Sequence, residues 1–340
     1  MKAIGFDEHL PISNPRSLFD FTAPLPILGE HDLLVKVSAV SVNPVDTYVR
    51  KGGRGKLAQP KVIGYDAAGV VDQVGPAVTL FRPGDRVYYA GSIRRPGSNS
   101  EYQAVDERIV GHAPQSLSLT QAAAMPLTSL TAYEALFEQL ALPQSPSANQ
   151  GKTILIINGT GGVGSVATQL AHLAGLRVIS TAGNPAGEEW VRAHGADLVV
   201  SHHQDLVKQV RALGYRYVDY LLELNDLDGH WQEMCELICP GGRLVSITEN
   251  RRPINLRLLT QKRGHFSWEW MFSKSYYHTA DMVSQHEILD RVAALLDAGK
   301  LQSTLTKQLS PLTAATLRQA HQLVEEGHMR GKVVVAGWPA

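Results

Sequence analysis

The chain has 340 residues, and its 32 lysines and arginines balance 32 aspartates and glutamates, so the formal net charge is zero. This length exceeds the roughly 300 residues at which a single hydrophobic core stops growing, and two domains are therefore expected. A net charge of zero supplies no overall field to attract nucleic acid or an anionic membrane, which excludes both as expected partners.

Targeting signals and cysteines indicate the compartment. No apolar run reaches the length of a membrane span, and the N-terminal M-K-A-I-G-F-D-E has acidic residues where a signal peptide would be apolar. The two cysteines, Cys235 and Cys239, are too few for a disulfide framework, and no further cysteine completes a tetrahedral metal set. We expect both on one face of a helix that ends at Pro240, in a cytoplasmic protein.

Up to about Thr120 the chain consists of short alternating apolar runs separated by turn signals, which predict a β-domain in the form of a partly open barrel. Three such runs begin at Val35, Ala68 and Arg82. From Thr120 to Leu142 apolar residues recur at helical spacing, so we predict one helix with Thr120 as its N-cap, joining two domains.

The second half alternates strand and helix. Buried strands are predicted at Thr153–Ile157, Arg177–Thr181, 196–200 and 217–222, and this alternation is typical of an α/β fold with a parallel sheet. Further on, helices are predicted over 281–296 and 313–326 and a strand over Lys332–Ala336. These last elements are too few for a third domain, and we expect them to complete the first one.

A glycine cluster follows the strand Thr153–Ile157. Its sequence is N-G-T-G-G-V-G, in which Gly159, Gly161 and Gly164 have the G-x-G-x-x-G spacing, with Gly162 and Val163 between the last two. The first glycine allows a tight turn, the second lets the backbone approach a pyrophosphate, and the third lets the helix pack on its strand. The helix N-terminus then favours the anion, so the cluster predicts a dinucleotide site. The alternative is a purely structural glycine turn.

The residues after the next strand indicate which dinucleotide binds. NAD sites use an acidic residue about 20 positions past the glycines, but here the first acidic residue after Gly164 is Glu188. The candidate cofactor residues Ser180, Thr181 and Asn184 are small and neutral, which favours NADPH, with NADH bound more weakly. The alternative is a strand-end turn without a ligand.

A histidine pair follows the predicted strand 196–200. Because neighbours on a strand end point in opposite directions, His202 and His203 are expected to make a poor metal chelate and to lie on the surface or at the adenine edge.

Several segments resemble the medium-chain dehydrogenase/reductase superfamily, most closely its zinc-free quinone oxidoreductase branch, which is zeta-crystallin-like. Besides N-G-T-G-G-V-G, they are N-P-V-D-T-Y-V-R at 43–50, G-Y-D-A-A-G-V-V at 64–71, G-D-R-V at 84–87 and A-A-M-P-L-T-S-L-T-A at 123–132. The run S-W-E-W-M-F at 267–272 resembles the subgroup labelled zinc-type alcohol dehydrogenase-like.

The resemblance implies a domain organisation. A GroES-like catalytic domain would comprise residues 1–124 plus 266–340, and a Rossmann nucleotide-binding domain residues 125–265. It also implies a homodimer whose sheet continues through a strand near Ile254–Leu259.

The resemblance further implies that both zinc sites of the zinc-dependent relatives are absent. Those relatives have a cysteine near the position of Asn43 to Val45, and a His-Glu pair where this chain has Tyr65 and Asp66. A catalytic zinc needs three such ligands. The open alternative is a zinc-type alcohol dehydrogenase with unorthodox ligands.

By the same resemblance Asn43, Asp46 and Tyr48 lie near the nicotinamide. We expect the Tyr48 hydroxyl to be the oxyanion or proton donor, Asn43 to position substrate and Asp46 to orient its neighbours. The alternative is a capped turn. Thr128 resembles a position beside the nicotinamide, and alternatively bonds its own helix backbone.

Without a metal, reduction of an activated acceptor is favoured, so the expected activity is NADPH-dependent reduction of a small-molecule quinone or α,β-unsaturated carbonyl. The non-enzymatic alternative is an NADPH-binding sensor.

Overall fold

The structure, a computed structural model, describes residues 1–339 and divides into two compact units. Unit 1 comprises Met1–Leu130 and Phe272–Ala340, and unit 2 comprises Thr131–Met271. The domain boundaries predicted from the sequence lie after residues 124 and 265. The first boundary falls inside helix α3 (Pro126–Tyr133), so the chain passes from unit 1 into unit 2 along a helix.

Unit 1 is built on a seven-stranded sheet of order β15-β16-β3-β5-β6-β8, in which β7 also pairs with β3. A three-stranded sheet, β2-β1-β4, accompanies it. The strands that precede the second domain are β1 (Lys2–Glu8), β2 (Phe19–Thr22), β3 (Asp32–Ser41), β4 (Lys56–Val62), β5 (Ala67–Val74), β6 (Arg86–Tyr89), β7 (Tyr102–Asp106) and β8 (Val110–His112). The long central strand β3 is rich in buried valines, because branched side chains pack well on a pleated surface.

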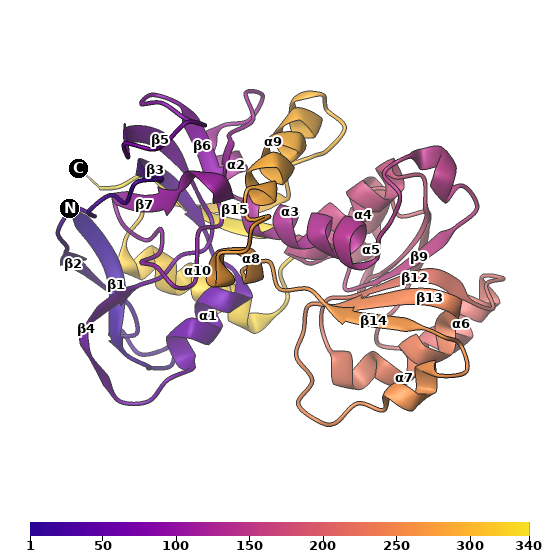
Figure 1. The fold of residues 1–340 in the computed structure, drawn as a ribbon. Helices are drawn as coiled ribbons and strands as arrows, with labels where there is room; N and C mark the ends of the chain where they lie inside the picture. Colours follow the sequence, from indigo (N-terminus) through magenta and orange to yellow (C-terminus); the bar gives the residue numbers. More distant parts are fainter. Residues whose placement is uncertain (340) are drawn as a thin grey trace. The chain divides into compact units, whose positions relative to one another are not determined.

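The C-terminal segment returns to unit 1, as predicted. Strand β16 (Lys332–Ala336) pairs antiparallel with β3 and parallel with β15 (Leu305–Leu309). The helices of this unit are α1 (Pro44–Lys51), α2 (Leu119–Ala122), α8 (Ser273–Tyr277), α9 (Ser284–Asp297), α10 (Ala314–Glu326) and the 3₁₀ turn η1 (Glu107–Ile109). Strand β3 from the N-terminal part of the chain and strands β15 and β16 from its C-terminal part therefore share one sheet (Figure 1).

The single helix predicted over residues 120–142 is wrong. Helix α2 begins after Ser118, whose hydroxyl accepts the Gln121 N–H, so Ser118 rather than Thr120 is the N-cap. The chain then turns, and α3 starts afresh at Pro126. Proline lacks an N–H and disfavours helix in the residue before it, so it suits a helix start and interrupts a continuing helix. A π-helical segment, η2 (Glu134–Gln139), follows.

Unit 2 contains a six-stranded parallel sheet of order β11-β10-β9-β12-β13-β14. Its strands are β9 (Thr153–Ile157), β10 (Arg177–Thr181), β11 (Leu198–Val200), β12 (Val218–Glu223), β13 (Ile238–Ser246) and β14 (His265–Trp268). Strand β9 is buried throughout, as expected for a strand covered on both faces. The α/β prediction is confirmed.

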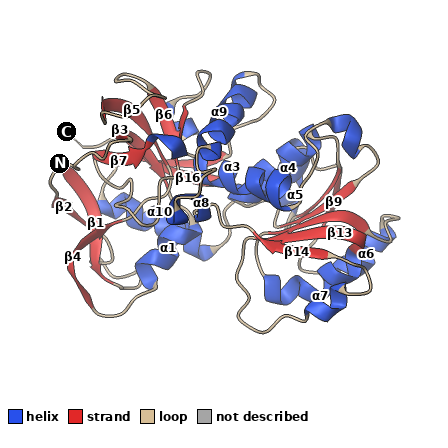
Figure 2. Cartoon of the chain, in the orientation of Figure 1, coloured by secondary structure: helices blue, strands red, loops and turns tan. Residues whose placement is uncertain are grey.

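Helices cover both faces of this sheet. Helices α4 (Gly162–Leu173) and α5 (Pro185–Ala193) lie on one face, and α6 (Leu206–Ala212) and α7 (Leu227–Leu237) lie on the other (Figures 1 and 2). A short 3₁₀ turn, η3 (Pro146–Asn149), precedes β9. This arrangement brings the carboxyl ends of the strands to one edge, where the loops that follow them gather.

Two local predictions in unit 2 are wrong. Helix α7 ends at Leu237, so Cys235 lies on the helix and Cys239 on β13, because the chain begins a strand before Pro240. Residues 254–259 contain a 3₁₀ turn, η4 (Leu256–Leu259), rather than a strand. The strand at this edge of the six-stranded sheet is β14, and β11 is at the other edge. In the part of the chain that is described, no helix is both long and apolar enough to cross a membrane.

A buried pair of carboxyl groups connects the π-helix to the segment after β14. Glu134 and Glu269 are both buried. Burial, and next the Glu134 carboxylate, raise the pKa of Glu269 to about 9. Glu269 is therefore protonated at neutral pH in the folded chain.

This protonation makes stability depend on pH. A carboxyl whose pKa is raised by folding binds more protons in the folded chain, so its contribution to stability is present below about pH 4.5 and is lost as pH rises toward about 9. Over this pH window Glu269 should make the unfolding free energy of the wild type fall by up to about 1.4 kcal/mol per pH unit. We expect Glu269→Gln to lack this part of the fall. Urea unfolding at several pH values measures it. The exposed Glu249→Gln is the control, and parallel curves for wild type and Glu269→Gln would contradict the assignment.

Candidate functional site

The glycine turn follows β9 directly, and its backbone differs in one detail from the expectation. The positive φ of the turn, 67°, belongs to Asn158 and not to Gly159. Gly159 is needed for another reason, since a Cβ there would collide with the Ser180 hydroxyl on the neighbouring strand. The first glycine therefore provides clearance between two strands, while Asn158 makes the turn.

The remaining glycines have the geometry of a dinucleotide turn. Gly161 is the N-cap of α4 in extended conformation, and Gly162 and Val163 begin the helix. A Cβ on Gly164 would collide with the Asn158 carbonyl, so this glycine allows the helix to pack on its strand. A Cβ on Gly161 would meet nothing closer than the Asn158 side-chain nitrogen at 3.2 Å. The backbone at Gly161 is thus open to a ligand, which fits a bound pyrophosphate.

The candidate residues after β10 differ in accessibility. Ser180 is fully buried, and its hydroxyl has no protein partner. The Thr181 hydroxyl accepts the Asn158 N–H at 2.8 Å and so connects β10 to the glycine turn. Asn184 caps helix α5, where its side-chain oxygen accepts the Gly187 N–H at 2.9 Å. Their contacts with a cofactor stay a prediction.

The expectation that His202 and His203 point apart is wrong. Strand β11 ends at Val200, so both histidines lie in the following turn, where side chains no longer alternate. Their ring centroids are 4.3 Å apart. The His202 Nδ1 atom lies 3.1 Å from the Thr181 hydroxyl, which places the pair beside the end of β10.

In unit 1, Asn43 and Asp46 organise the start of α1. The Asn43 backbone N–H donates to the Asp46 carboxylate at 2.8 Å. Burial raises the pKa of Asp46 to about 7, although the Asn43 N–H and the Lys332 ammonium act in the opposite direction. Asp46 therefore holds the helix start, as the prediction that it orients its neighbours and the alternative of a capped turn both require.

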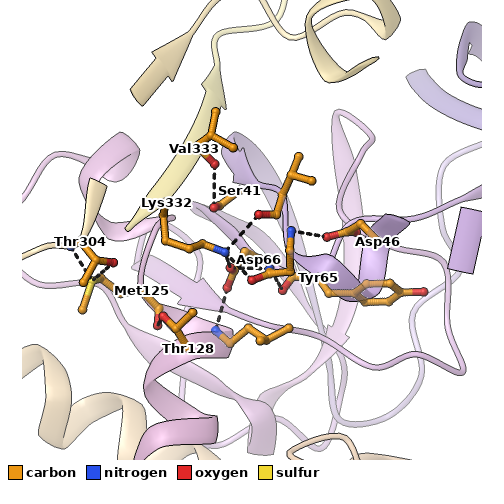
Figure 3. A network of polar contacts seen from close by, with 12 residues as sticks. Ser41, Asp46, Tyr65, Asp66, Met125, Thr128, Thr304, Lys332 and Val333 are labelled. Atoms are coloured by element: carbon orange, nitrogen blue, oxygen red, sulfur yellow. Dashed lines mark hydrogen bonds and ion pairs between the residues drawn. The ribbon is translucent and has the colours of Figure 1, made fainter. Parts of the chain in front are cut away.

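The Asn43 side chain is held entirely by the protein and is only 1% exposed. Its nitrogen donates to the Asp66 carboxylate at 2.7 Å and to the Tyr65 carbonyl at 3.2 Å, and its oxygen accepts from the Lys332 ammonium. Figure 3 shows these three partners, Tyr65, Asp66 and Lys332, side by side. Its predicted role in positioning substrate stays a prediction, and the contacts seen are those of an internal brace.

Lys332 is the residue that sequence reasoning missed. It lies on β16 with its side chain buried, and its ammonium donates to the Asp66 carboxylate at 3.0 Å and to the Val42 carbonyl at 3.3 Å. The other Asp66 oxygen accepts the Leu127 N–H at 2.7 Å, at the start of α3. Burial raises the pKa of Asp66, and Lys332 opposes that rise most strongly. The sequence does contain a signal for this residue, because Lys332 is a charged residue directly before the three valines of a predicted strand.

The hydroxyls near this network differ in their surroundings. Tyr48 on α1 is 65% exposed, so its hydroxyl is accessible. The Thr128 hydroxyl donates to the Met125 carbonyl at 3.1 Å, the backbone bond that the alternative interpretation expected. Tyr65 is buried against Phe272, its hydroxyl has no protein partner, and burial raises its pKa.

Comparisons with known proteins agree with this architecture. A family model described as an alcohol dehydrogenase GroES-like domain matches residues 29–117, and one described as a zinc-binding dehydrogenase matches residues 194–335. A zinc-type alcohol dehydrogenase-like protein of Staphylococcus aureus is 42% identical over 98% of this chain and 99% of its own. A quinone oxidoreductase of Lama guanicoe is 31% identical over 92% of this chain and 90% of its own.

A solved structure is similar over the whole chain. It is a putative zinc-dependent alcohol dehydrogenase of Rhizobium etli, with a TM-score of 0.94 and 46% identity over 100% of this chain and 99% of that one. The chain belongs to the medium-chain dehydrogenase/reductase superfamily, with a Rossmann-like sheet in unit 2 and a GroES-like domain in unit 1. It is an oxidoreductase of that family.

A catalytic zinc does not fit the side chains at the positions of the zinc ligands in zinc-dependent relatives. Zinc takes thiolate, imidazole and carboxylate ligands. Here an amide and a phenol stand at two positions, and the carboxylate of Asp66 is already paired with the Lys332 ammonium, which would repel a second cation. Within residues 1–339, no group of three histidine, cysteine or acidic side chains is arranged to hold a metal ion.

The Lys332 network predicts a large loss of stability when its cation is removed. Lys332→Met would leave Asp66 buried without its partner, so we expect the unfolding free energy to fall by about 3–5 kcal/mol. The double variant Lys332→Met/Asp66→Asn should lose less, because the buried charge is removed as well. Urea unfolding measures both. Lys300→Met, at an exposed lysine, is the control, and a loss below about 1 kcal/mol in Lys332→Met would contradict this account.

The glycine turn predicts two distinguishable defects. Gly161→Ala would place a methyl group 3.2 Å from the Asn158 side-chain nitrogen, a contact that a small shift of that side chain relieves. We therefore expect near-normal stability with loss of dinucleotide binding, because the methyl group takes the space through which the backbone approaches a pyrophosphate. Gly164→Ala forces α4 away from β9 and should lower stability as well. Thermal unfolding and fluorescence titration with NADPH separate the two effects. Tight NADPH binding by Gly161→Ala would show that the turn is structural only.

Proposed function

We propose that the protein reduces quinones or α,β-unsaturated carbonyls with NADPH, by hydride transfer without a catalytic zinc. The observation that carries this proposal is the Lys332 ammonium, buried where a zinc ion would need its ligands. Oxidation of a simple alcohol needs a Lewis acid to stabilise the alkoxide. An activated acceptor needs only hydrogen-bond donors for its developing oxyanion.

The cofactor residues are those of the glycine turn and the end of β10. The open backbone at Gly161 and the N-terminus of α4 fit the pyrophosphate. No carboxylate lies between Ser180 and Gly187, so nothing there repels a 2′-phosphate, which favours NADPH over NADH. When bound, the dihydronicotinamide supplies the hydride.

The acceptor needs one hydride on carbon and one proton on oxygen. We assign the hydrogen bond to the acceptor oxygen, and the proton, to the exposed Tyr48 hydroxyl, which recovers its proton from solvent. Asn43 and Asp46 hold the start of α1 and thereby orient Tyr48. This assignment gives the two buried residues a supporting role.

The proposed state is a cytoplasmic homodimer formed through the free edge of β14. Beside this strand lies a groove of 470 Å³ whose apolar lining includes Leu256, Phe266 and Trp268. Trp268 is 49% and Leu256 57% exposed, so the groove presents a contiguous apolar surface of the kind that marks an interaction site.

The activity test uses purified, metal-stripped protein and follows absorbance of NADPH and NADH with quinones, enals and simple aldehydes. We expect NADPH oxidation with quinones or enals without added zinc. Tyr48→Phe should lower kcat about 10²-fold, the effect of losing one oxyanion donor, with NADPH binding unchanged.

Tyr217→Phe is the matched control, because this residue immediately precedes β12, at the amino edge of the sheet. Activity that returns only with zinc would support the alcohol dehydrogenase alternative instead. Tight NADPH binding without turnover of any acceptor would support a sensor.

A further inference from the structure

The two histidines after β11 converge on the end of β10. A Cβ on Gly183, two residues past the strand, would lie 2.8 Å from the His203 Nε2 atom and 3.3 Å from the His202 Nε2 atom. The imidazole edges therefore face the Gly183 backbone. This cluster of two titratable rings has no part in the hydride chemistry.

Hydrogen bonding orients the His202 ring. The Thr181 hydroxyl accepts the Asn158 N–H, so its own proton is free to be donated to the His202 Nδ1 atom, 3.1 Å away. The contact sets the orientation of the ring, whose Nε2 atom faces Gly183. The same hydroxyl also joins the ring to the glycine turn.

The end of the second strand is where a dinucleotide fold meets the 2′ position of the adenosine ribose. The two arginines nearest in sequence are paired with carboxylates. Arg192 donates to Glu188 at 2.8 Å, and Arg177, at the amino end of β10, lies 3.4 Å from Asp197. The imidazoles that face Gly183 are side chains at the carboxyl end of the strand that can supply a positive charge to a 2′-phosphate.

Charged side chains around His202 and His203 are paired with one another. His230 on α7 lies 2.9 Å from Glu233, and Asp205 at the start of α6 pairs with Lys208 at 3.2 Å. Burial lowers the pKa of His202, and His203 and His230 lower it further. The unliganded ring is therefore neutral at pH 7, and a phosphate placed against it would favour its protonated form.

Resting on the proposed use of NADPH, we propose that His202 and His203 bind the adenosine 2′-phosphate and make the preference for NADPH over NADH increase as pH falls. Protonated imidazoles donate charge-assisted hydrogen bonds to the phosphate. NADH has a hydroxyl at this position, so its affinity should not follow the same titration.

The test measures binding rather than turnover. Dissociation constants for 2′,5′-ADP and 5′-AMP, which differ by the 2′-phosphate alone, and for NADPH and NADH are measured by calorimetry between about pH 6 and about pH 8. We expect 2′,5′-ADP and NADPH to bind about tenfold more tightly at the lower pH, an effect of the size of one charge-assisted hydrogen bond. The affinities of 5′-AMP and NADH should stay within about twofold.

Variants assign the effect to the pair. We expect the pH dependence of binding to decrease in His202→Gln and His203→Gln and to disappear in the double variant. At low pH the substitutions should weaken the binding of 2′,5′-ADP about tenfold and leave the binding of 5′-AMP unchanged. His328→Gln, at an exposed histidine of unit 1, is the control.

Equal losses of affinity for 2′,5′-ADP and 5′-AMP in the histidine variants would indicate an adenine contact and overturn the inference. A preference of the wild type for NADPH over NADH that does not change with pH would overturn it as well. If neither NADPH nor NADH binds at all, the proposed function fails and the inference fails with it. Tight NADPH binding that the histidine substitutions do not change would overturn the inference and leave the proposed function standing.

Discussion

The buried ion pair between Lys332 and Asp66 is the interaction on which the arrangement of unit 1 depends. One ammonium from the last strand meets a carboxylate that also accepts from Asn43 and from the first turn of α3. Four segments of the chain, around residues 43, 66, 127 and 332, are thereby joined at one point. Each charge is tolerated in the interior only because the other is present, so the C-terminal strand is as necessary to the site as α1 itself.

The same pair bears on the chemistry that is open to the protein. Asp66, at a position where the resemblance to zinc-dependent members places a metal ligand, is already bonded to the Lys332 ammonium, and an ammonium offers no open coordination position to a substrate. Under the proposed function, the hydrogen bond that polarises an acceptor is assigned to Tyr48, which is exposed on α1.

Close packing is the governing constraint in unit 2. The turn after β9 brings Asn158, Gly159 and Gly164 so near to one another and to β10 that added methyl groups would collide. The Thr181 hydroxyl ties this turn to the next strand and to His202. The glycine turn, Thr181 and His202 therefore belong to one connected layer.

The sequence alone determined the elements whose signal is local. The glycine spacing, the strands Thr153–Ile157 and Arg177–Thr181, the returning strand Lys332–Ala336 and the family all follow from neighbouring residues, because periodicity and turn chemistry act over short distances. The tertiary structure decided what distant segments do to each other. It paired Lys332 with Asp66 and turned the two histidines toward Gly183. Such contacts join residues that no local pattern relates, so only the folded chain could establish them.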